Sequence, residues 1–266
     1  MHFAKKEKGI IANSTRKQKI IVSLTTYPKR FDVVHLTLET LLNQTVKPDK
    51  IILWLSQEEV SSHDNIPKHI QKLSDRGLEI KIVSKNLRSY NKLIYALKEY
   101  SNDLIITVDD DIFYPNFLVE ELYKKYLQYN NCIIAYRCSQ IEMKNGKIVP
   151  YLSWKSAKDY QNPSYKLFPT GVGGILYPPG SLNREVFNEA LFMELAPTAD
   201  DIWFKAMALL NGTKTIQVFK DSIEFPLIDG SQDDALWKIN NGQNQNDIQL
   251  KKVFDYFDLY DYIQKD

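Results

Sequence analysis

The sequence predicts an α/β protein with a mostly parallel central sheet flanked by helices, and two observations carry this prediction. Short apolar, β-branched runs alternate with segments of helical spacing four times in the first half of the chain. The chain has 266 residues and 44% hydrophobic content, enough for a large core. Alternating strands and helices of this kind form parallel sheets covered on both faces.

The elements of the first half are short and regular. Strands are expected at residues 20–24, 50–55, 79–83 and 104–108, and helices at 33–42, 68–73 and 89–100. The pattern then changes to a small antiparallel portion, marked by the Asn145-Gly146 hairpin signal. The expected elements there are a helix at 116–129, a strand at 132–136, a hairpin at 141–149, a strand at 173–177, a helix to about 210 and a strand at 213–219. Residues 240–247, rich in Asn and Gln, predict a flexible loop, and residues 253–260 a short helix.

Composition excludes several classes of protein. The net charge of +1 gives no general attraction to nucleic acid. Two cysteines, Cys132 and Cys138, and four histidines do not form a zinc or disulfide pattern. The basic amino terminus lacks the apolar core of a signal peptide, and no apolar run reaches the roughly 20 residues of a membrane-spanning helix. We therefore expect a cytoplasmic protein with a frayed basic leader, for which peripheral contact with an anionic membrane stays open.

Three consecutive acids, Asp109, Asp110 and Asp111, directly follow the apolar run at residues 104–108. They therefore lie at the end of a strand, where α/β sheets bind ligands. Two carboxylates about 4 Å apart repel by about 4 kcal/mol at an effective dielectric constant near 20. Mg²⁺ or Mn²⁺ removes this repulsion and usually shares its ligands with phosphate. The pattern favours a metal-diphosphate site over the alternative, a solvated turn in which Asp111 caps the next helix.

A second acidic pair, Asp200 and Asp201, opens a predicted helix. Thr198 with Asp201 three residues later forms a capping box, which would account for one acid and tolerate both at the positive end of the helix. The alternative is that one carboxylate projects into a cleft as a general base. The glycines at 173 and 174 fit either a turn or a close approach of the backbone to a ligand.

These features, in this order, resemble the GT-A fold glycosyltransferases, especially the inverting bacterial enzymes of glycosyltransferase family 2. The three aspartates resemble the family's Asp-any-Asp motif, and Asp-Asp-Ile-Trp-Phe-Lys-Ala from Asp200 resembles its Glu-Asp motif. Residues 89–97 resemble the helix whose Lys and Asn lie near the donor nucleotide. The resemblance implies a catalytic domain at 19–219, with a nucleotide-sugar half at 19–111 and an acceptor half at 112–219. Residues 1–18 would be a flexible leader, and 220–266 an extension packed on the same domain.

The resemblance also implies ligands and roles. The donor would be a nucleoside diphosphate sugar, most often a UDP-sugar, with Mn²⁺ or Mg²⁺ as cofactor. The acceptor would be a glycan or lipid-linked oligosaccharide in bacterial surface polysaccharide synthesis. Asp111 would bind the cation, Asp109 would bind the cation or the ribose, and Asp110 would lie nearby. Asp201 or Asp200 would be the general base. The other implied residues are Thr25, Thr26, Tyr27, Arg30 and Lys92 at the nucleotide, and Gly173, Gly174 and Trp203 at the donor sugar or acceptor.

Other functions compete with this interpretation. A haloacid-dehalogenase-like phosphatase also places Asp-any-Asp after an apolar strand, but near the start of its domain, whereas here three strand–helix units come first. A sugar-nucleotide pyrophosphorylase would need a glycine-rich first loop, which residues 25–30 lack. A catalytically inactive nucleotide-sugar-binding module would bind the donor without transferring its sugar.

Overall fold

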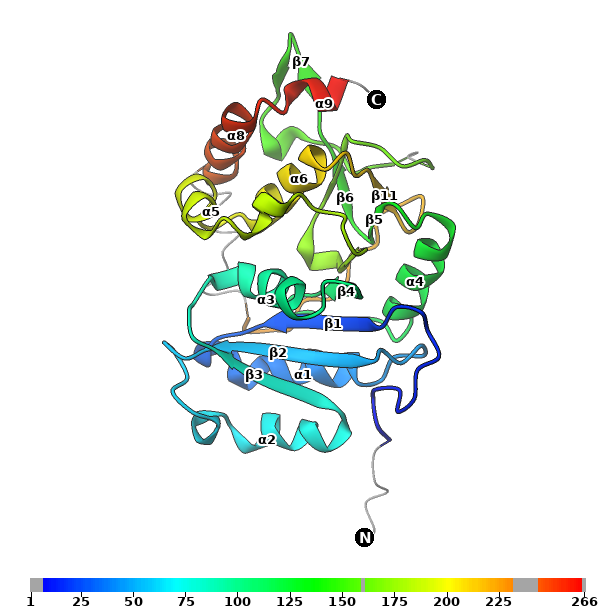
Figure 1. Cartoon of the computed structure of the whole chain (residues 1–266), viewed down its shortest axis with the longest axis vertical. Coiled ribbons are helices and arrows are strands. Elements are labelled where there is room, and N and C mark those ends of the chain that lie inside the picture. Colours follow the sequence, from blue (N-terminus) through cyan, green and yellow to red (C-terminus); the bar gives the residue numbers. More distant parts are fainter. Residues whose placement is uncertain (1–6, 159–160, 232–243, 265–266) are drawn as a thin grey trace. The chain divides into compact units, whose positions relative to one another are not determined.

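The computed structural model describes residues 7–158, 161–231 and 244–264, and the chain divides into two compact units (Figure 1). The first unit holds the chain up to residue 121 together with Phe225–Ser231. The second unit holds residues 122–224 and the chain from residue 232 on.

The first unit is built on four parallel strands in the order β3-β2-β1-β4. Their bounds are β1 (Ile20–Thr25), β2 (Lys50–Ser56), β3 (Leu78–Val83) and β4 (Leu104–Thr107). The middle strands are buried apolar runs, as expected for strands covered on both faces. Ile20 of β1 is opposite Leu104 of β4, so the carboxyl ends of these two strands lie next to each other. The predicted parallel sheet is confirmed, with strand bounds within two residues of those expected.

Three helices complete the first unit: α1 (Phe31–Leu41), α2 (Lys68–Gln71) and α3 (Asn91–Glu99). A 3-10 helix, Pro28–Arg30, links β1 directly to α1, and α3 packs against β1 and β4. The buried face of α1 contains Val34, Leu38 and Leu41, and also the polar Thr37. This tight connection brings Arg30 to the end of β1.

The segment Phe225–Ser231, called here the return segment, pairs with the chain just after β4. The Phe113 N–H donates to the Pro226 carbonyl at 2.9 Å, and the Ile228 N–H donates to the Asp111 carbonyl at 2.8 Å. Ile112 and Leu227 form an antiparallel bridge. The return segment therefore fixes the backbone that carries the three aspartates.

The second unit contains a small mixed sheet and two antiparallel pairs. β5 (Ile133–Ala135) lies between β11 (Thr215–Gln217), which is parallel to it, and β10 (Ile175–Tyr177), which is antiparallel. The pairs are β6 (Cys138–Gln140) with β9 (Leu167–Pro169), and β7 (Met143–Lys144) with β8 (Lys147–Ile148). Asn145 and Gly146 join β7 to β8 with positive φ angles of 52° and 73°, which confirms the predicted hairpin.

The helices of the second unit include α5 (Glu189–Leu195), α6 (Asp200–Leu210), α8 (Gln245–Phe257) and α9 (Tyr260–Gln264). The chain passes from the first unit to the second within α4 (Leu118–Gln128). α8 packs against α6, where the Phe257 and Trp203 rings are 5.7 Å apart. The predicted flexible loop at 240–247 is wrong for residues 245–247, which form the first turn of α8; residues 240–243 lie outside the described chain. The helix predicted at residues 253–260 is present as α8, but it begins at Gln245 and ends at Phe257.

The leader is anchored from residue 9 on. The Gly9 N–H donates to the Arg76 carbonyl at 2.8 Å, and Arg16 forms an ion pair with Asp49 at 2.8 Å. A Cβ atom at Gly9 would lie 2.6 Å from the Leu42 backbone oxygen, so only glycine fits against this neighbour. Gly9 and Arg16 of the expected leader therefore contact the first unit.

The predicted α/β class with a mostly parallel sheet, flanking helices and a small antiparallel portion is confirmed. Of the helices that the structure describes, none combines the length and the apolar character needed to cross a bilayer.

Candidate active site

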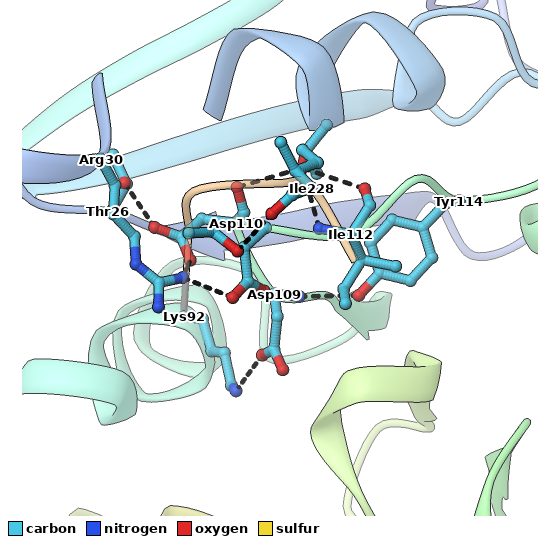
Figure 2. A network of polar contacts seen from close by, with 11 residues as sticks. Thr26, Arg30, Lys92, Asp109, Asp110, Ile112, Tyr114 and Ile228 are labelled. Atoms are coloured by element: carbon cyan, nitrogen blue, oxygen red, sulfur yellow. Dashed lines mark hydrogen bonds and ion pairs between the residues drawn. The ribbon is translucent and has the colours of Figure 1, made fainter. Parts of the chain in front are cut away.

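Asp110 lies just beyond β4 and is turned toward the loop that follows β1 (Figure 2). Its carboxylate accepts hydrogen bonds from the Thr26 hydroxyl at 2.5 Å and from the Arg30 guanidinium at 2.6 Å. Burial raises the pKa of Asp110 to about 6, although Arg30 and Thr26 act in the opposite direction. Asp110 thus joins the ends of β1 and β4 and is fully engaged by protein groups.

Arg30 bridges two neighbouring carboxylates. Its NH1 atom lies 2.6 Å from Asp110 Oδ1 and 2.7 Å from Asp111 Oδ2, and these ion pairs are largely shielded from water. Burial alone would lower the pKa of Arg30, but Asp110 and Asp111 together raise it, so the guanidinium stays charged. Its carbon Cζ also lies 5.7 Å from the centre of the Tyr27 ring. Arg30 therefore offsets the repulsion between adjacent acids that the sequence predicts.

Asp109 is paired with a different cation. Its carboxylate lies 2.8 Å from Lys92 Nζ on α3 (Figure 2). The Lys92 carbonyl accepts a hydrogen bond from Ser23 on β1, which fixes this helix to the sheet. The Asp109 N–H donates to the Tyr114 hydroxyl at 2.9 Å. The Asp109 side chain is 30% exposed and those of Asp110 and Asp111 are 11% exposed, so Asp109 is the most accessible of the three.

The backbone of the acidic motif is held by Thr37, which sequence reasoning missed. Its hydroxyl lies 3.0 Å from the carbonyl oxygens of Asp110 and Ile112, and it accepts the Ile112 N–H at 3.1 Å. Thr37 is fully buried on the apolar face of α1. The sequence does hold a signal for this residue: Thr37 lies three positions after Val34, on the same face of the helix. A polar side chain on a buried helix face needs a hydrogen-bond partner.

The donor set fits a hard divalent cation completed by substrate oxygens. Three carboxylates face two cationic side chains, which leaves the cluster with net negative charge. Among the described residues, no three His, Cys, Asp or Glu side chains are arranged to hold a metal ion by themselves. Mg²⁺ is usually held by one or two carboxylates together with substrate phosphates. Asp111 and Asp109 suit this role better than Asp110, because Asp110 is held by both Thr26 and Arg30.

Thr25, expected at the nucleotide, bonds mainly to the protein. Its hydroxyl donates to the Trp54 carbonyl at 3.0 Å and accepts from Asn91 Nδ2 at 3.4 Å. The structure therefore brings Thr26, Arg30 and the three aspartates into one network, and Lys92 joins it through Asp109; Thr25 connects β1 to β2 and α3.

The second acidic pair lies at the start of α6 in the second unit. Asp201 Oδ2 accepts the Gly171 N–H at 2.9 Å, and Asp200 is buried. The N-cap residue of α6 is Ala199, which has no side-chain cap, and Thr198 bonds to Gln249 instead. The capping-box interpretation is therefore wrong: the Asp201 carboxylate reaches a loop outside its own helix.

The glycines of this loop have separate functions. Gly171 supplies the N–H that holds Asp201, which sequence reasoning missed. A Cβ atom at Gly173 would lie 2.9 Å from Arg137 Cβ, and Gly174 has φ of +84°. Both Gly173 and Gly174 are buried, so packing and backbone conformation account for them without a ligand.

Trp203 was expected to contact sugar, and the structure corrects this. The side chain is 0% exposed, and its Nε1–H donates to the Val186 carbonyl at 3.3 Å. Its ring packs against Phe192 and Phe257 at centroid distances of 5.9 and 5.7 Å. Trp203 is a core residue.

The acidic cluster lies at the carboxyl ends of parallel strands, which is where open α/β sheets bind their ligands. Residues 22–191, more than half of the chain, match the sequence model of "Glycosyl transferase family 2". The chain therefore belongs to this family, and it is a glycosyltransferase. This assignment speaks against the phosphatase alternative.

One solved structure supports the same fold. The mannosyltransferase PcManGT from Pyrobaculum calidifontis, in complex with GDP-Man and Mn²⁺, aligns with a TM-score of 0.55 and 13% identity, over 95% of this chain and 67% of that chain. S. aureus TarS 1–349 in complex with UDP aligns with a TM-score of 0.48 and 17% identity, over 78% of this chain and 59% of that chain. No curated protein sequence matches this chain. The expected GT-A fold is confirmed.

Proposed function

We propose that this protein is a metal-dependent, inverting glycosyltransferase whose donor is a nucleoside diphosphate sugar, with UDP-sugars as first candidates. One observation carries the proposal: Arg30 and Lys92, from two different elements, converge on three consecutive aspartates at the end of β4. The inward-facing Asp110 organises this cluster. Asp111 and Asp109 remain as the oxygen ligands of a cation that the donor diphosphate shares.

The donor half would stabilise the negative charge of the leaving diphosphate. A bound Mn²⁺ or Mg²⁺ would act as a Lewis acid that neutralises charge on the leaving diphosphate. Arg30 and Lys92 keep positive charge within the cluster and add to this neutralisation, while Thr26, through Asp110, holds the loop that would frame the nucleotide. Because PcManGT was solved with GDP-Man, GDP-sugars are the second group of candidate donors.

The acceptor half would supply the general base. We assign this role to Asp201 rather than Asp200, because Asp200 is buried and Asp201 is partly exposed. The Gly171 N–H holds one Asp201 oxygen and so orients the carboxylate. As the acceptor oxygen attacks the anomeric carbon, the bond to the diphosphate breaks on the opposite face, and Asp201 takes the acceptor proton. Such base catalysis is worth roughly 10²–10⁴-fold in rate.

The acceptor class follows from the resemblance to bacterial family 2 enzymes: a growing glycan or a lipid-linked oligosaccharide of a surface polysaccharide. A cytoplasmic enzyme that contacts the inner face of the plasma membrane fits such an acceptor. This part of the proposal is an analogy of fold and family rather than site chemistry.

The proposal is tested by measuring the transfer of sugar from donor to acceptor. The wild type is incubated with UDP-glucose, UDP-galactose, UDP-N-acetylglucosamine or GDP-mannose, with Mn²⁺ and a mixture of oligosaccharides, and products are detected by mass spectrometry. NMR of the product should show an inverted anomer, and Asp201→Asn should lower the rate by roughly 10²–10⁴-fold. Asp75→Asn, at an exposed position of the first unit, is the matched control and should remain active.

Three results would contradict the proposal. A retained anomer would remove Asp201 as the base. Nucleotide binding without transfer or donor hydrolysis would favour the inactive binding module. Release of phosphate from p-nitrophenyl phosphate, without any sugar transfer, would restore the phosphatase alternative.

A further inference from the structure

α8 lies outside the part of the chain that matches the family, yet its first turns bind two segments near Asp201. The first contact is made by Gln249, which is buried. Its Oε1 accepts the Thr198 N–H at 3.0 Å, and its Nε2 donates to Thr198 Oγ1 at 2.9 Å. Nε2 also lies 3.1 Å from the Gln245 carbonyl of the same helix. The oxygen and the nitrogen of the buried Gln249 amide therefore both bond to Thr198, which lies two positions before α6.

This contact replaces the cap that the sequence predicts. Thr198 would bond to the first turn of α6 in a capping box, but its backbone and hydroxyl both bond to Gln249, and α6 has no side-chain cap. The entry into α6 is thus fixed from α8, 51 residues away in sequence. Asp201 follows Thr198 by three residues, so the position of this turn determines where the Asp201 carboxylate points.

The second contact is made by Asp247. Its Oδ1 accepts the Tyr151 N–H at 2.7 Å, at the start of the 3-10 helix Tyr151–Ser153. The Tyr151 ring lies 5.7 Å from the Phe168 ring on β9, three residues before the Gly171 that holds Asp201. Burial raises the pKa of Tyr151, and the Asp201 carboxylate raises it further. Asp247 thus holds a segment that packs against the strand leading to Gly171.

We propose that α8 is a positioning element for glycosyl transfer: Gln249 sets the direction of the Asp201 carboxylate, and Asp247 holds the Tyr151 segment against β9, the strand that leads to Gly171. The inference rests on the proposed role of Asp201 as the base. Gln249 and Asp247 are positioning residues that act through other groups. The apolar contact between Trp203 and Phe257 holds the remainder of α8 to α6, so loss of the Gln249 amide should shift the turn without detaching the helix.

The expected effect is a loss of turnover rather than of donor binding. Gln249→Leu keeps a side chain of similar size but leaves the Thr198 N–H and hydroxyl without their partner. A misplacement of a catalytic group by about 1 Å can reduce the rate about 100-fold. We expect Gln249→Leu to lower kcat by roughly 10–100-fold and to change KM for the donor by less than about twofold, because the donor site lies in the first unit. Thr198→Ser keeps the N–H and the hydroxyl and should behave as wild type.

The experiment has two readouts. The first is hydrogen exchange of peptides covering residues 168–174 and 197–203, in which Gln249→Leu should exchange about tenfold faster than wild type. The second is kcat and KM for donor hydrolysis or sugar transfer, measured on whichever of UDP-glucose, UDP-galactose, UDP-N-acetylglucosamine and GDP-mannose the wild type turns over. Lys252→Gln, at an exposed position of α8, is the matched control and should change neither readout. If Gln249→Leu does not fold, Thr198→Val, which removes only the hydroxyl contact, takes its place.

The outcomes separate this inference from the proposed function. An active wild type with unchanged kcat in folded Gln249→Leu overturns the positioning role alone. A second outcome is a lower melting temperature with full turnover at a temperature where the variant is folded. That result also overturns the positioning role, because Gln249 would then contribute to stability alone. A wild type that neither hydrolyses nor transfers sugar from any of the four donors overturns the proposed function, and this inference with it.

Discussion

Replacing Thr37 with valine should loosen the backbone of the acidic motif while preserving the shape of the core. The Thr37 hydroxyl accepts the Ile112 N–H at 3.1 Å and lies 3.0 Å from the carbonyl oxygens of Asp110 and Ile112. Valine leaves this buried N–H without a partner, which costs about 1–3 kcal/mol, and removes a hydroxyl donor worth about 1 kcal/mol. The expected destabilisation is therefore about 3 kcal/mol. At about 2–4 °C per kcal/mol, the melting temperature should fall by about 6–12 °C.

The assay is urea unfolding of the wild type, Thr37→Val and Thr37→Ser, with thermal unfolding as a second measurement. Serine retains the hydroxyl and loses one methyl group, so its destabilisation should be only about 1 kcal/mol. The midpoint should shift without a change in slope if only native-state stability changes. If Thr37→Val is as stable as Thr37→Ser, the hydroxyl does not hold the motif, and the reasoning is refuted.

Three further predictions concern the surroundings of the same motif and the two thiols. Arg30→Met leaves two adjacent buried carboxylates without their cation and should destabilise the protein by about 3–5 kcal/mol; Mn²⁺ should then raise the melting temperature more than in wild type, and equal Mn²⁺ shifts would contradict this. Tyr114→Phe removes the acceptor of the Asp109 N–H and should lower the free energy of unfolding by about 1–3 kcal/mol in urea titrations; an unchanged midpoint would show that this bond is dispensable. Burial raises the pKa of the Cys138 thiol to about 12 and also raises that of Cys132, so at pH 8 Cys138 should react with a disulfide reagent roughly 10³-fold more slowly in the native than in the unfolded protein. Rapid native labelling of Cys138, located by peptide mapping, would show that this thiol is not buried.

The parallel sheet of the first unit could be predicted because its signal is local. Each strand is a short buried run and each following helix has its own apolar period, so the order of elements follows from the sequence alone. The three aspartates could also be placed, since only Val108 separates them from the end of β4. Their cationic partners Arg30 and Lys92 were expected in the same region, and the resemblance implied separate roles for the three acids. The contacts of Asp110 with Thr26 and Arg30 were not predicted, because three identical residues give no sign of which carboxylate turns inward.

The contacts that sequence reasoning missed are long-range and made mostly by backbone groups. The return segment binds the Asp111 carbonyl and Phe113 N–H through main-chain atoms, which carry no residue-type signature. Gly171 likewise holds Asp201 through its N–H, whereas the more conspicuous glycines at 173 and 174 serve packing and turn geometry. Trp203 was misjudged because an aromatic beside an acidic pair fits a sugar site and a core equally well, and tertiary packing decides between them.

The central claim is that the acidic motif binds a nucleoside diphosphate together with a divalent cation. Calorimetric titration of UDP and GDP into wild type, Asp111→Asn and Asp75→Asn, each with Mn²⁺ or with EDTA, tests it most directly. We predict that one nucleotide binds wild type and Asp75→Asn only with Mn²⁺, and that Asp111→Asn loses this binding. Nucleotide binding of equal strength in EDTA, or undiminished binding by Asp111→Asn, would contradict the account.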